Sequence, residues 1–336
     1  MEQPSTKRVG LIMEYIKCLK PGLLTTIQDL GRPSYQSFGV SVSGAMDPLS
    51  LKLANIIVGN PPDYAALEIT LLGPEILFEG EGIIAITGAD LSPTLNGKAI
   101  PMWKAIHIEG GAVLKFGKGK NGCRSYLAIL GGIDVPEVMG SKSTFIRGRY
   151  GGMEGRALQS NDYIPIGPFH PKWMNLVKNR RIPDCYIPNF SNDVVRFVWG
   201  PHNREFEGES KELFVKRLYQ VTNQSDRMGY RLDGDPLVHK KSADILSEFA
   251  APGTIQVPAN GKPIILMADC QMSGGYTKIG MVIGTDIPLV AQKKPGDTIK
   301  FHPISILQAQ EEWKRQMKWL SILAANNLRL NRKTAI

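Results

Sequence analysis

The sequence predicts a mainly β protein with a few helices, in which short strands form barrels. Glycine and proline are abundant, with 35 and 23 residues among 336, which favours short strands joined by tight turns. Apolar segments of strand length, such as 82–86, 112–116 and 126–130, are bounded by glycine or by a turn pair. Few long stretches have helical periodicity, so barrels are favoured over helical architectures.

The order of these segments divides the chain into two halves. Residues 1–12 are expected to form a disordered tail, and residues 13–167 a first β-barrel domain. The proline-rich residues 168–192 are expected to be a linker. A second β-barrel domain is expected over residues 193–302, followed by a C-terminal helix over residues 303–336.

Two helices can be placed from their patterns. Residues 48–58 follow a capping Asp47, begin with Pro48 and precede Gly59, which suits the position after a helix end. The C-terminal helix is expected to be amphipathic and to pack on the body of the protein, with recognition of a partner as the less favoured alternative. Its apolar stripe consists of Ile306, Trp313 and Leu320, spaced by seven, with Met317 and Ala324 beside them.

The formal net charge of +9 does not predict a nucleic-acid binder. Much of the excess positive charge lies in residues 303–336, which contain six Lys and Arg but only two acidic residues, Glu311 and Glu312. No basic stretch is interleaved with aromatic residues, as single-strand binding would require. The mildly basic body suits anionic small molecules instead.

The location of the protein is predicted to be cytoplasmic. No apolar run approaches the ~18 residues that span a bilayer, and residues 1–6 do not resemble a signal peptide. The four cysteines, Cys18, Cys123, Cys185 and Cys270, are far apart, which indicates reduced thiols rather than a disulfide framework.

Several familiar chemistries find no support in the sequence. A GxxxxGK[ST] phosphate loop and a GxSxG nucleophile elbow are both missing. The five histidines are scattered, so no metal site is expected.

Polar residues gather in a glycine-rich stretch near the N-terminus. Between Thr25 and Asn60, glycines at 31, 39 and 44 alternate with Gln28, Asp29, Arg32, Ser41, Ser43 and Asp47. Glycine at this density permits positive φ and close approach of another group, and loops of this kind often carry binding residues. A glycine-rich hairpin capped by Asp47 explains the same residues equally well.

A second polar cluster lies in the second half. Ser225, Asp226 and Arg227 combine a hydroxyl, a carboxylate and a guanidinium, and an arginine fork binds carboxylate or phosphate in a bidentate manner. Asp226 could hold Arg227 in place or accept a proton, and a structural ion pair is equally open. Residues 269–276 are expected to form a loop whose backbone N–H groups can cradle an anion. In the first half, Glu68 is a carboxylate with apolar neighbours.

Several motifs together carry a family resemblance over residues 13–302. QDLGR, FGVSVSGAMD and LANIIVGN, then GSKST, SDRMGYRL, GTIQVP and GGY, occur in that order. The chain thereby resembles the allophanate-hydrolase subunit 2-like family of biotin-dependent carboxyltransferase-like proteins. That family includes the C component of bacterial ATP-dependent 5-oxoprolinase and the carboxyltransferase region of urea carboxylase. It implies two cyclophilin-like β-barrel domains.

The resemblance also implies an activity. In the family, 5-oxoproline is opened to L-glutamate by phosphorylation of the lactam oxygen and attack by water, with ATP and its Mg counterion as cofactors. The implied partners are a subunit-1-like protein of the KipI type and a third 5-oxoprolinase subunit, with no nucleic acid or membrane and with activity only in the complex. The chain looks closest to stand-alone members of the KipA type, described as antagonising an inhibitor of a sporulation kinase. A purely regulatory binding protein remains an alternative. So does a carboxyltransferase component acting on urea or allophanate, for which biotin would come from a partner.

Site residues carry over onto matching positions. The resemblance implies catalytic roles for Asp29, Arg32, Asp226 and Arg227, with either aspartate as general base. Substrate- or nucleotide-binding residues are implied at Gln28, Ser43, Asp47, Glu68, Ser225, Gln256, Asp269, Gln271, Gly274, Gly275 and Tyr276. Met272 and Ser273 depart from the family pattern. The residues of the two halves are expected to converge on one cleft.

Overall fold

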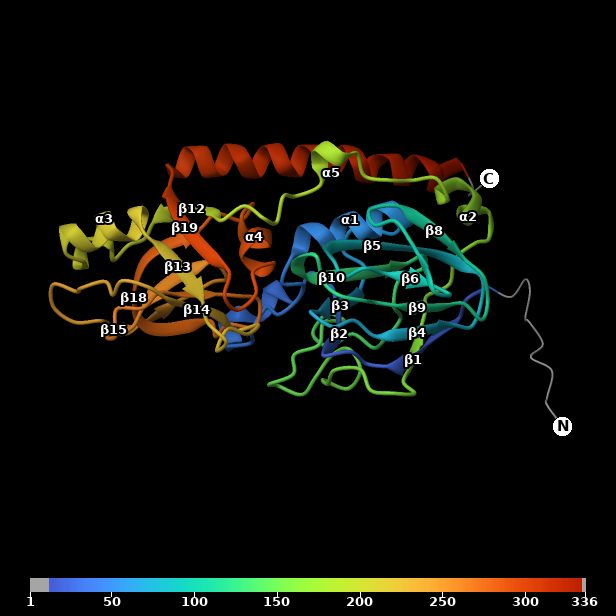
Figure 1. The fold of residues 1–336 in the computed structure, drawn as a ribbon, viewed down its shortest axis with the longest axis horizontal. Coiled ribbons are helices and arrows are strands. Elements are labelled where there is room, and N and C mark those ends of the chain that lie inside the picture. The colour runs from blue at the N-terminus through green and yellow to red at the C-terminus, as the bar shows by residue number, and fades with distance from the viewer. Residues whose placement is uncertain (1–11, 334–336) are drawn as a thin grey trace. The chain divides into compact units, whose positions relative to one another are not determined.

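The computed structural model describes residues 12–333, with side chains described for residues 12–325. These residues form two compact units. The first unit contains the chain up to Gly31, Pro48–Ile187 and the chain from Ile322, and the second contains Arg32–Asp47 and Pro188–Ser321. Strands dominate both units (Figure 1), so the prediction of a mainly β protein with a few helices is confirmed.

The first unit is built from two antiparallel sheets. The six-stranded sheet has the order β11-β1-β4-β9-β6-β7, and the five-stranded sheet has the order β2-β3-β10-β5-β8. The strands are β1 (Tyr15–Lys20), β2 (Leu24–Gln28), β3 (Ala66–Thr70), β4 (Glu75–Phe78), β5 (Gly82–Asp90), β6 (Thr94–Leu95), β7 (Lys98–Ala99), β8 (Ala105–Ile108), β9 (Val113–Lys115), β10 (Asn121–Ile129) and β11 (Tyr163–Pro165).

Alternating apolar residues of the two sheets meet in one core. In β1, Ile16 and Cys18 are fully buried, and they share this core with Ile69 of β3. The strands β5 and β10 are buried on both faces because helix α1 (Pro48–Val58) packs against them. The predicted helix over residues 48–58 is confirmed at both limits.

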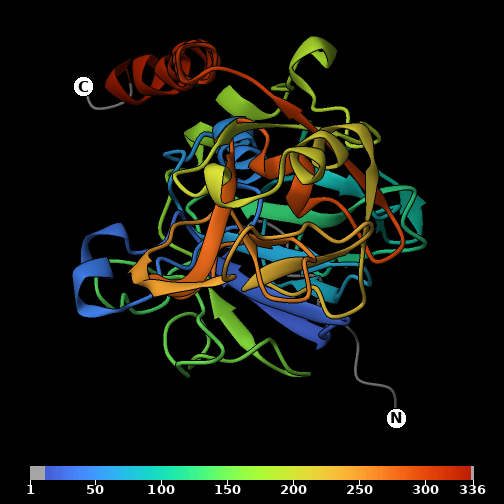
Figure 2. The ribbon, with the colours of Figure 1, turned by 90° about the vertical axis from the view of Figure 1, so that its left-hand side faces the viewer.

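The second unit contains a closed barrel. Its strands follow the order β12-β19-β13-β14-β17-β16-β18, and β18 pairs with β12 to close the ring, while β15 adds to β18 as an eighth, edge strand. Figure 2 shows this unit facing the viewer. The strands are β12 (Val194–Trp199), β13 (Leu218–Val221), β14 (Gly229–Asp233), β15 (Asp244–Phe249), β16 (Thr254–Val257), β17 (Ile264–Leu266), β18 (Ser273–Val282) and β19 (Thr298–Pro303).

Aromatic side chains fill the barrel. Phe197, Phe214 and Phe301 are buried, and the rings of Phe214 and Phe301 stack with centroids 4.3 Å apart. Phe214 comes from helix α3 (Gly208–Lys216), which packs on β19. Closure removes the edges that an open sheet would expose, which fits the expected cyclophilin-like type.

The compact units are not the continuous ranges expected from the sequence. Residues 32–47 belong to the second unit, although they precede most of the first in the chain. Residues 168–187 belong to the first unit and carry helix α2 (Lys172–Val177) and a short 3-10 helix (Asp184–Tyr186). The prolines exclude regular strands there, but Val177 and Ile182 are buried and anchor the segment. The disorder expected for residues 1–12 lies outside the described residues, except for Ile12, which bridges Glu81.

The C-terminal amphipathic helix is confirmed as α5 (Ile306–Lys333). A reciprocal capping box begins it: Gln308 N–H donates to Ser305 Oγ at 3.2 Å, and Ser305 N–H donates to Gln308 Oε1 at 2.9 Å. Leu320 on the predicted stripe is buried, whereas Ile306 is 63% and Trp313 46% exposed. The stripe is therefore only partly covered by the described residues.

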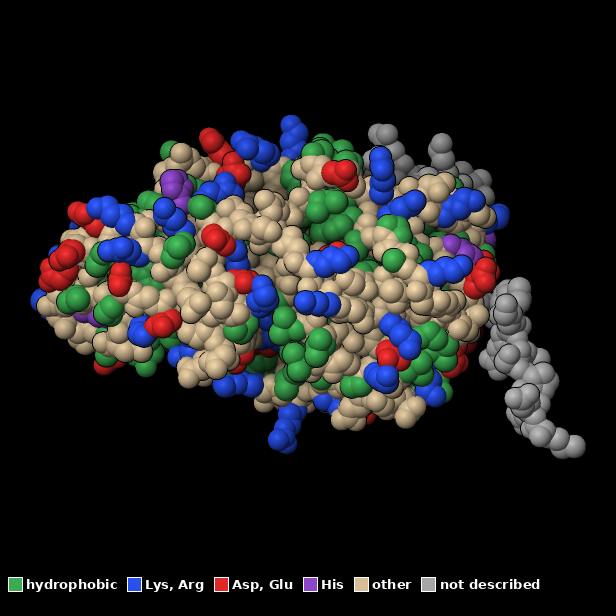
Figure 3. Space-filling model, viewed as in Figure 1, with side chains coloured by type: hydrophobic (Ala, Val, Ile, Leu, Met, Phe, Trp, Pro, Cys, Tyr) green, Lys and Arg blue, Asp and Glu red, His purple; other side chains and the backbone are tan. Residues whose placement is uncertain are grey.

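Two properties of the surface bear on possible partners. None of the helices in the described part of the chain is long and apolar enough to cross a membrane. On the face drawn in Figure 3, the Lys and Arg side chains are dispersed among acidic and polar ones. On this face, the positive charge therefore forms no single patch.

Candidate functional site

Residues 32–47 bring part of the glycine-rich stretch into the second unit. The segment folds through a 3-10 helix (Pro33–Phe38) that ends at Gly39 in the left-handed conformation. Arg32 N–H then donates to Val42 O at 2.8 Å, which closes the loop at its base. The hydroxyl of Ser41 donates to Cys270 O at 2.9 Å, and Ser43 N–H donates to Ala268 O at 3.0 Å.

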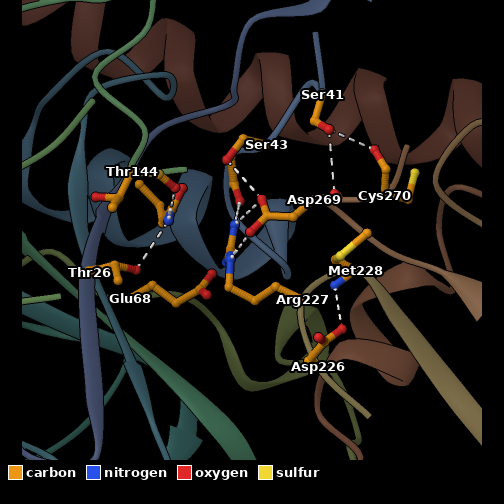
Figure 4. A network of polar contacts seen from close by, with 12 residues as sticks. Thr26, Ser41, Ser43, Glu68, Thr144, Asp226, Arg227, Met228, Asp269 and Cys270 are labelled. Carbon is orange, nitrogen blue, oxygen red and sulfur yellow. Dashed lines mark hydrogen bonds and ion pairs between the residues drawn. The ribbon is translucent and has the colours of Figure 1, made fainter. Parts of the chain in front are cut away.

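A buried ion pair stands at the centre of this arrangement. Arg227 binds Asp269 in a bidentate manner, through Nε to Oδ2 at 2.9 Å and Nη2 to Oδ1 at 3.0 Å (Figure 4). Both residues are 6% exposed. Ser43 Oγ also donates to Asp269 Oδ1 at 2.8 Å, and Arg227 Nη2 donates to Gly44 O at 2.6 Å. Positive φ at Ser43 and Gly44, 58° and 88°, turns this carbonyl toward the guanidinium.

Asp226 and Ser225 lie beside this pair but serve a turn. Asp226 is exposed, and its Oδ1 accepts hydrogen bonds from the N–H groups of Met228 at 2.7 Å and Gly229 at 3.2 Å. Ser225 Oγ accepts from Arg231 N–H at 3.1 Å. The residue that holds Arg227 is therefore Asp269 rather than its neighbour in the sequence.

Asp47 is fully buried and belongs to the same unit. Its Oδ2 accepts a hydrogen bond from Gln292 Nε2 at 2.9 Å, just after helix α4 (Ile287–Ala291). Arg32 is also buried, with 1% of its surface exposed. A charge in such surroundings must be compensated by polar contacts, which makes both positions intolerant of apolar replacements. The cap on α1 expected from Asp47 stays a prediction.

In the first unit, Asp29 is a hub for a loop that follows 112 residues later. Its Oδ1 accepts from Gly31 N–H and Ser141 Oγ, both at 2.7 Å, and from Ser143 Oγ. Its Oδ2 accepts from Lys142 N–H at 2.6 Å. Ser143 Oγ also accepts from Asp29 N–H at 3.0 Å. This carboxylate accepts donors on both oxygens, a pattern that fixes the loop.

Gln28 and Glu68 are buried in the first unit as well. Gln28 Nε2 donates to Thr26 Oγ1 and Thr144 O, both at 3.1 Å. Its Oε1 is buried with no hydrogen-bond partner among the described residues. Glu68 accepts from Tyr126 Oη at 2.7 Å, and its other oxygen lies 3.9 Å from Arg124 Nε. Such pairing is what a buried carboxylate requires.

The glycine pair at 274–275 is not the loop that the sequence predicted. It begins strand β18, where Gly274 pairs with Glu248 of the edge strand β15. The loop predicted for residues 273–276 is therefore wrong, because the added edge strand extends the ladder to this point. Anion binding by these N–H groups stays a prediction. Gln271 and Tyr276 beside the pair are exposed, and Gln256 on β16 is buried.

Two buried cysteines are unsuited to thiol chemistry, and the described residues form no metal site. Burial raises the pKa of the Cys270 thiol to about 12 and that of Cys18 to about 11, so both stay protonated at neutral pH. In the described part of the chain no group of three His, Cys, Asp or Glu side chains could hold a metal ion.

Sequence reasoning missed several residues that complete these clusters. Ser141, Ser143 and Tyr126 support Asp29 and Glu68, and Gln292 supports Asp47. The two serines lie in the GSKST run that carries the family resemblance, which was the available signal. Gln292 follows the short helix α4, and the sequence assigned it no role at the site.

The order of these elements corresponds to a known domain. The carboxyltransferase domain, subdomains A and B, matches residues 38–303, most of the chain. The chain belongs to this carboxyltransferase family. Its fold agrees with that assignment, since the structure of Kluyveromyces lactis urea carboxylase superposes on 94% of this chain and 30% of that chain, with a TM-score of 0.87 and 33% identity.

Two relatives indicate where the chain stands within the carboxyltransferase family. It is 37% identical over 309 residues to the C component of 5-oxoprolinase from Escherichia coli (strain K12), covering 92% of this chain and 97% of that protein. It is also 37% identical to urea amidolyase of Saccharomyces cerevisiae over 307 residues, but these cover 86% of this chain and only 17% of the relative. The carboxyltransferase fold therefore occurs both as a separate subunit and as part of a larger enzyme.

Proposed function

We propose that this chain is a component of an ATP-dependent 5-oxoprolinase, which opens 5-oxoproline to L-glutamate together with other subunits. The observation that carries the proposal is the match to 97% of the C component of Escherichia coli 5-oxoprolinase. The match to urea amidolyase covers only 17% of that relative, so most of that enzyme lies outside the match. Correspondence over a whole subunit supports a shared role more strongly than correspondence to one part of a larger enzyme.

A lactam needs a hydrogen-bond acceptor for its N–H group and donors for its carbonyl oxygen. The buried Oε1 of Gln28 matches the first requirement, because it has no hydrogen-bond partner among the described residues. An acceptor left unsatisfied in this way costs free energy that a bound N–H group would recover. Gln28 is therefore our candidate for contact with the substrate in the first unit.

Hydrogen bonding distinguishes the two candidate bases, Asp29 and Asp226. Both carboxylate oxygens of Asp29 already accept hydrogen bonds from the loop, so neither is open to a substrate group. Both bonds to Asp226 go to Oδ1, and the side chain is exposed. We therefore favour Asp226 as the general base.

Replacement of Asp226 by asparagine tests this assignment. Asn keeps an oxygen that can accept from Met228 and Gly229, so the free energy of unfolding should change by less than about 1 kcal/mol. Loss of a general base should lower turnover by about 100-fold or more. Steady-state kinetics of the assembled enzyme and urea denaturation of the variant provide the two measurements. Wild-type turnover in this variant would refute the assignment.

ATP enters the proposal as a cofactor of the assembly. The run Gly140–Thr144 does not fit a phosphate cradle, because Lys142 N–H and the hydroxyls of Ser141 and Ser143 already bind Asp29. The Lys142 ammonium binds Ile133 O and Asp134 at 3.1 and 3.0 Å. No phosphate-transfer step is therefore assigned to these residues.

The decisive experiment compares the chain alone with its assembly. The full chain, with and without a subunit-1-like partner, would be assayed for ADP release with 5-oxoproline, urea or allophanate. We expect ADP release that depends on 5-oxoproline only in the assembly. Appreciable 5-oxoproline turnover by the chain alone would contradict the shared role, and a preference for urea or allophanate would contradict the substrate.

A carboxyltransferase acting on urea or allophanate is the second candidate. The match of the carboxyltransferase domain to residues 38–303 and the TM-score of 0.87 to Kluyveromyces lactis urea carboxylase favour it. It would require biotin carried by a partner protein. Urea-dependent ADP release that also needs bicarbonate and a biotinylated partner would identify this activity.

A further inference from the structure

Two polar side chains share the outer face of the barrel strands β16 and β18. On β16, Ile255 and Val257 point into the core, so Gln256 between them lies on the opposite face. Gln256 is paired in register with Lys278 of β18. Opposite residues of antiparallel strands point to the same face with Cβ atoms about 5 Å apart. The two side chains are therefore neighbours.

Gln256 has an unused hydrogen-bond donor. The side chain is 6% exposed, and its Nε2 is buried with no hydrogen-bond partner among the described residues. Glycine at 274 leaves the space that the carboxamide occupies, since a Cβ there would lie 2.3 Å from Nε2. A donor buried without a partner is costly and in native proteins calls for an explanation such as a ligand.

Lys278 is equally buried, and its ammonium is paired with a carboxylate that can move into solvent. The residue is 5% exposed, and its Nζ donates to Glu248 Oε2 at 2.8 Å. An ammonium carries three N–H groups, so one carboxylate oxygen does not exhaust its capacity to donate. Glu248 lies on the edge strand β15 with its side chain 51% exposed, so this acceptor can move away into solvent.

His202 completes the surroundings of the carboxylate. Its Nδ1 accepts from Lys278 N–H at 3.2 Å, so the neutral ring carries its proton on Nε2. That nitrogen lies 3.8 Å from Glu248 Oε2. The Lys278 ammonium holds the pKa of the Glu248 carboxyl below its usual range, and the carboxylate is ionised at neutral pH. Glu248 therefore occupies the place that an external anion would take.

We propose that Gln256 Nε2 and Lys278 Nζ form an oxyanion-binding site, in which Glu248 is an internal competitor for the lysine. The ligand oxygens belong to a carboxylate or a phosphate, because a neutral and a charged donor lie on neighbouring residues of the same face. Two sources share this chemistry, the carboxylate of a small substrate and a phosphate of a nucleotide. The site does not depend on which reaction the protein serves.

Isothermal titration calorimetry of the full chain tests the site. The probes are 5-oxoproline, pyrrolidin-2-one (the same lactam without its carboxylate), allophanate, ATP and inorganic phosphate. Gln256→Leu and Lys278→Met should weaken binding of the recognised oxyanion by about 10- to 100-fold. Glu248→Gln should tighten it by about 3- to 10-fold, because a competing negative charge is removed. A residue that only stabilises the fold would not give tighter binding.

The exposed pair Glu212–Lys216, with its Nζ–Oε2 distance of 2.9 Å, provides matched controls. Glu212→Gln and Lys216→Met should leave the dissociation constants within about twofold of wild type. Glu248→Gln is the decisive variant, because glutamine keeps an oxygen that can accept from Lys278 Nζ, so this variant is expected to fold even if Lys278→Met unfolds. Wild-type affinity in Glu248→Gln, or no binding of any probe by the wild type, would overturn the site.

The same probes identify the source of the oxyanion. Binding of 5-oxoproline but not of pyrrolidin-2-one identifies a carboxylate, and binding of ATP and phosphate alone identifies a phosphate. If allophanate binds with this response to the variants and 5-oxoproline does not, the oxyanion site is supported while the 5-oxoprolinase proposal fails. The two proposals can thus be refuted separately.

Discussion

Replacement of Arg227 by methionine is expected to lower the free energy of unfolding by about 3–5 kcal/mol. The change removes the bidentate partner of Asp269 and leaves a carboxylate that is 6% exposed without its compensating charge. The sequence alone left an anion-binding arginine and a structural ion pair equally open, and the geometry favours the pair. Urea denaturation of the full chain, followed by circular dichroism, would measure the loss.

Two further variants serve as controls for Arg227→Met. Lys216→Met breaks an exposed ion pair with Glu212 and should cost less than about 1 kcal/mol. The double variant Arg227→Met with Asp269→Leu removes both charges and should recover part of the loss, because no buried charge is left unpaired. If Arg227→Met unfolds like the wild type but abolishes activity of the assembled enzyme, Arg227 binds substrate instead.

Asp29→Ala should have the second-largest effect, a loss of about 3 kcal/mol. The change removes the acceptor for Gly31 N–H, Lys142 N–H and the hydroxyls of Ser141 and Ser143, of which the two serines are buried. Each bond to a charged acceptor is worth about 1.5–3 kcal/mol, but water recovers part of the loss for the more exposed donors. Urea denaturation would measure the change, and faster exchange of the Lys142 amide proton would locate it.

Asp134→Ala provides the matched control in the same loop. Asp134 binds the Lys142 ammonium at 3.0 Å, but its side chain is 59% exposed. Loss of this exposed pair should cost less than about 1 kcal/mol. A large loss of activity in Asp29→Ala, without any loss of stability, would show that Asp29 acts on substrate and that its role in the loop is minor.

Local features of the fold were predictable because their causes are local. Pro48 at the start of α1 and Gly59 after its end were predictable from their backbone preferences. The apolar spacing identified the C-terminal helix. Turn residues between short apolar segments were enough to predict a mainly β protein. These signals need only neighbouring residues, so a single sequence contains them.

Long-range pairing was not predictable in the same way. Nothing near Asp29 indicates that its donors come from residues 141–143, and nothing near Arg227 points to Asp269. The Gly274–Gly275 pair was predicted to be a loop, because nothing in these two residues indicates that an edge strand pairs with them. The convergence of both halves on one cleft, and the roles of Arg32, Asp47 and Gln256, stay predictions.

The membership of residues 32–47 in the second unit has a consequence for how the protein is made. Ser43 is synthesised 226 residues before Asp269, whose side chain accepts a hydrogen bond from the Ser43 hydroxyl. At about 5–20 residues per second, this loop waits roughly 10–45 s for its partner. During translation, the nascent chain must therefore keep an early segment available while Pro48–Ile187 is already able to fold. A fragment that begins at Pro188 would lack Ser43 and Gly44, so the second unit cannot be produced intact from its C-terminal portion alone.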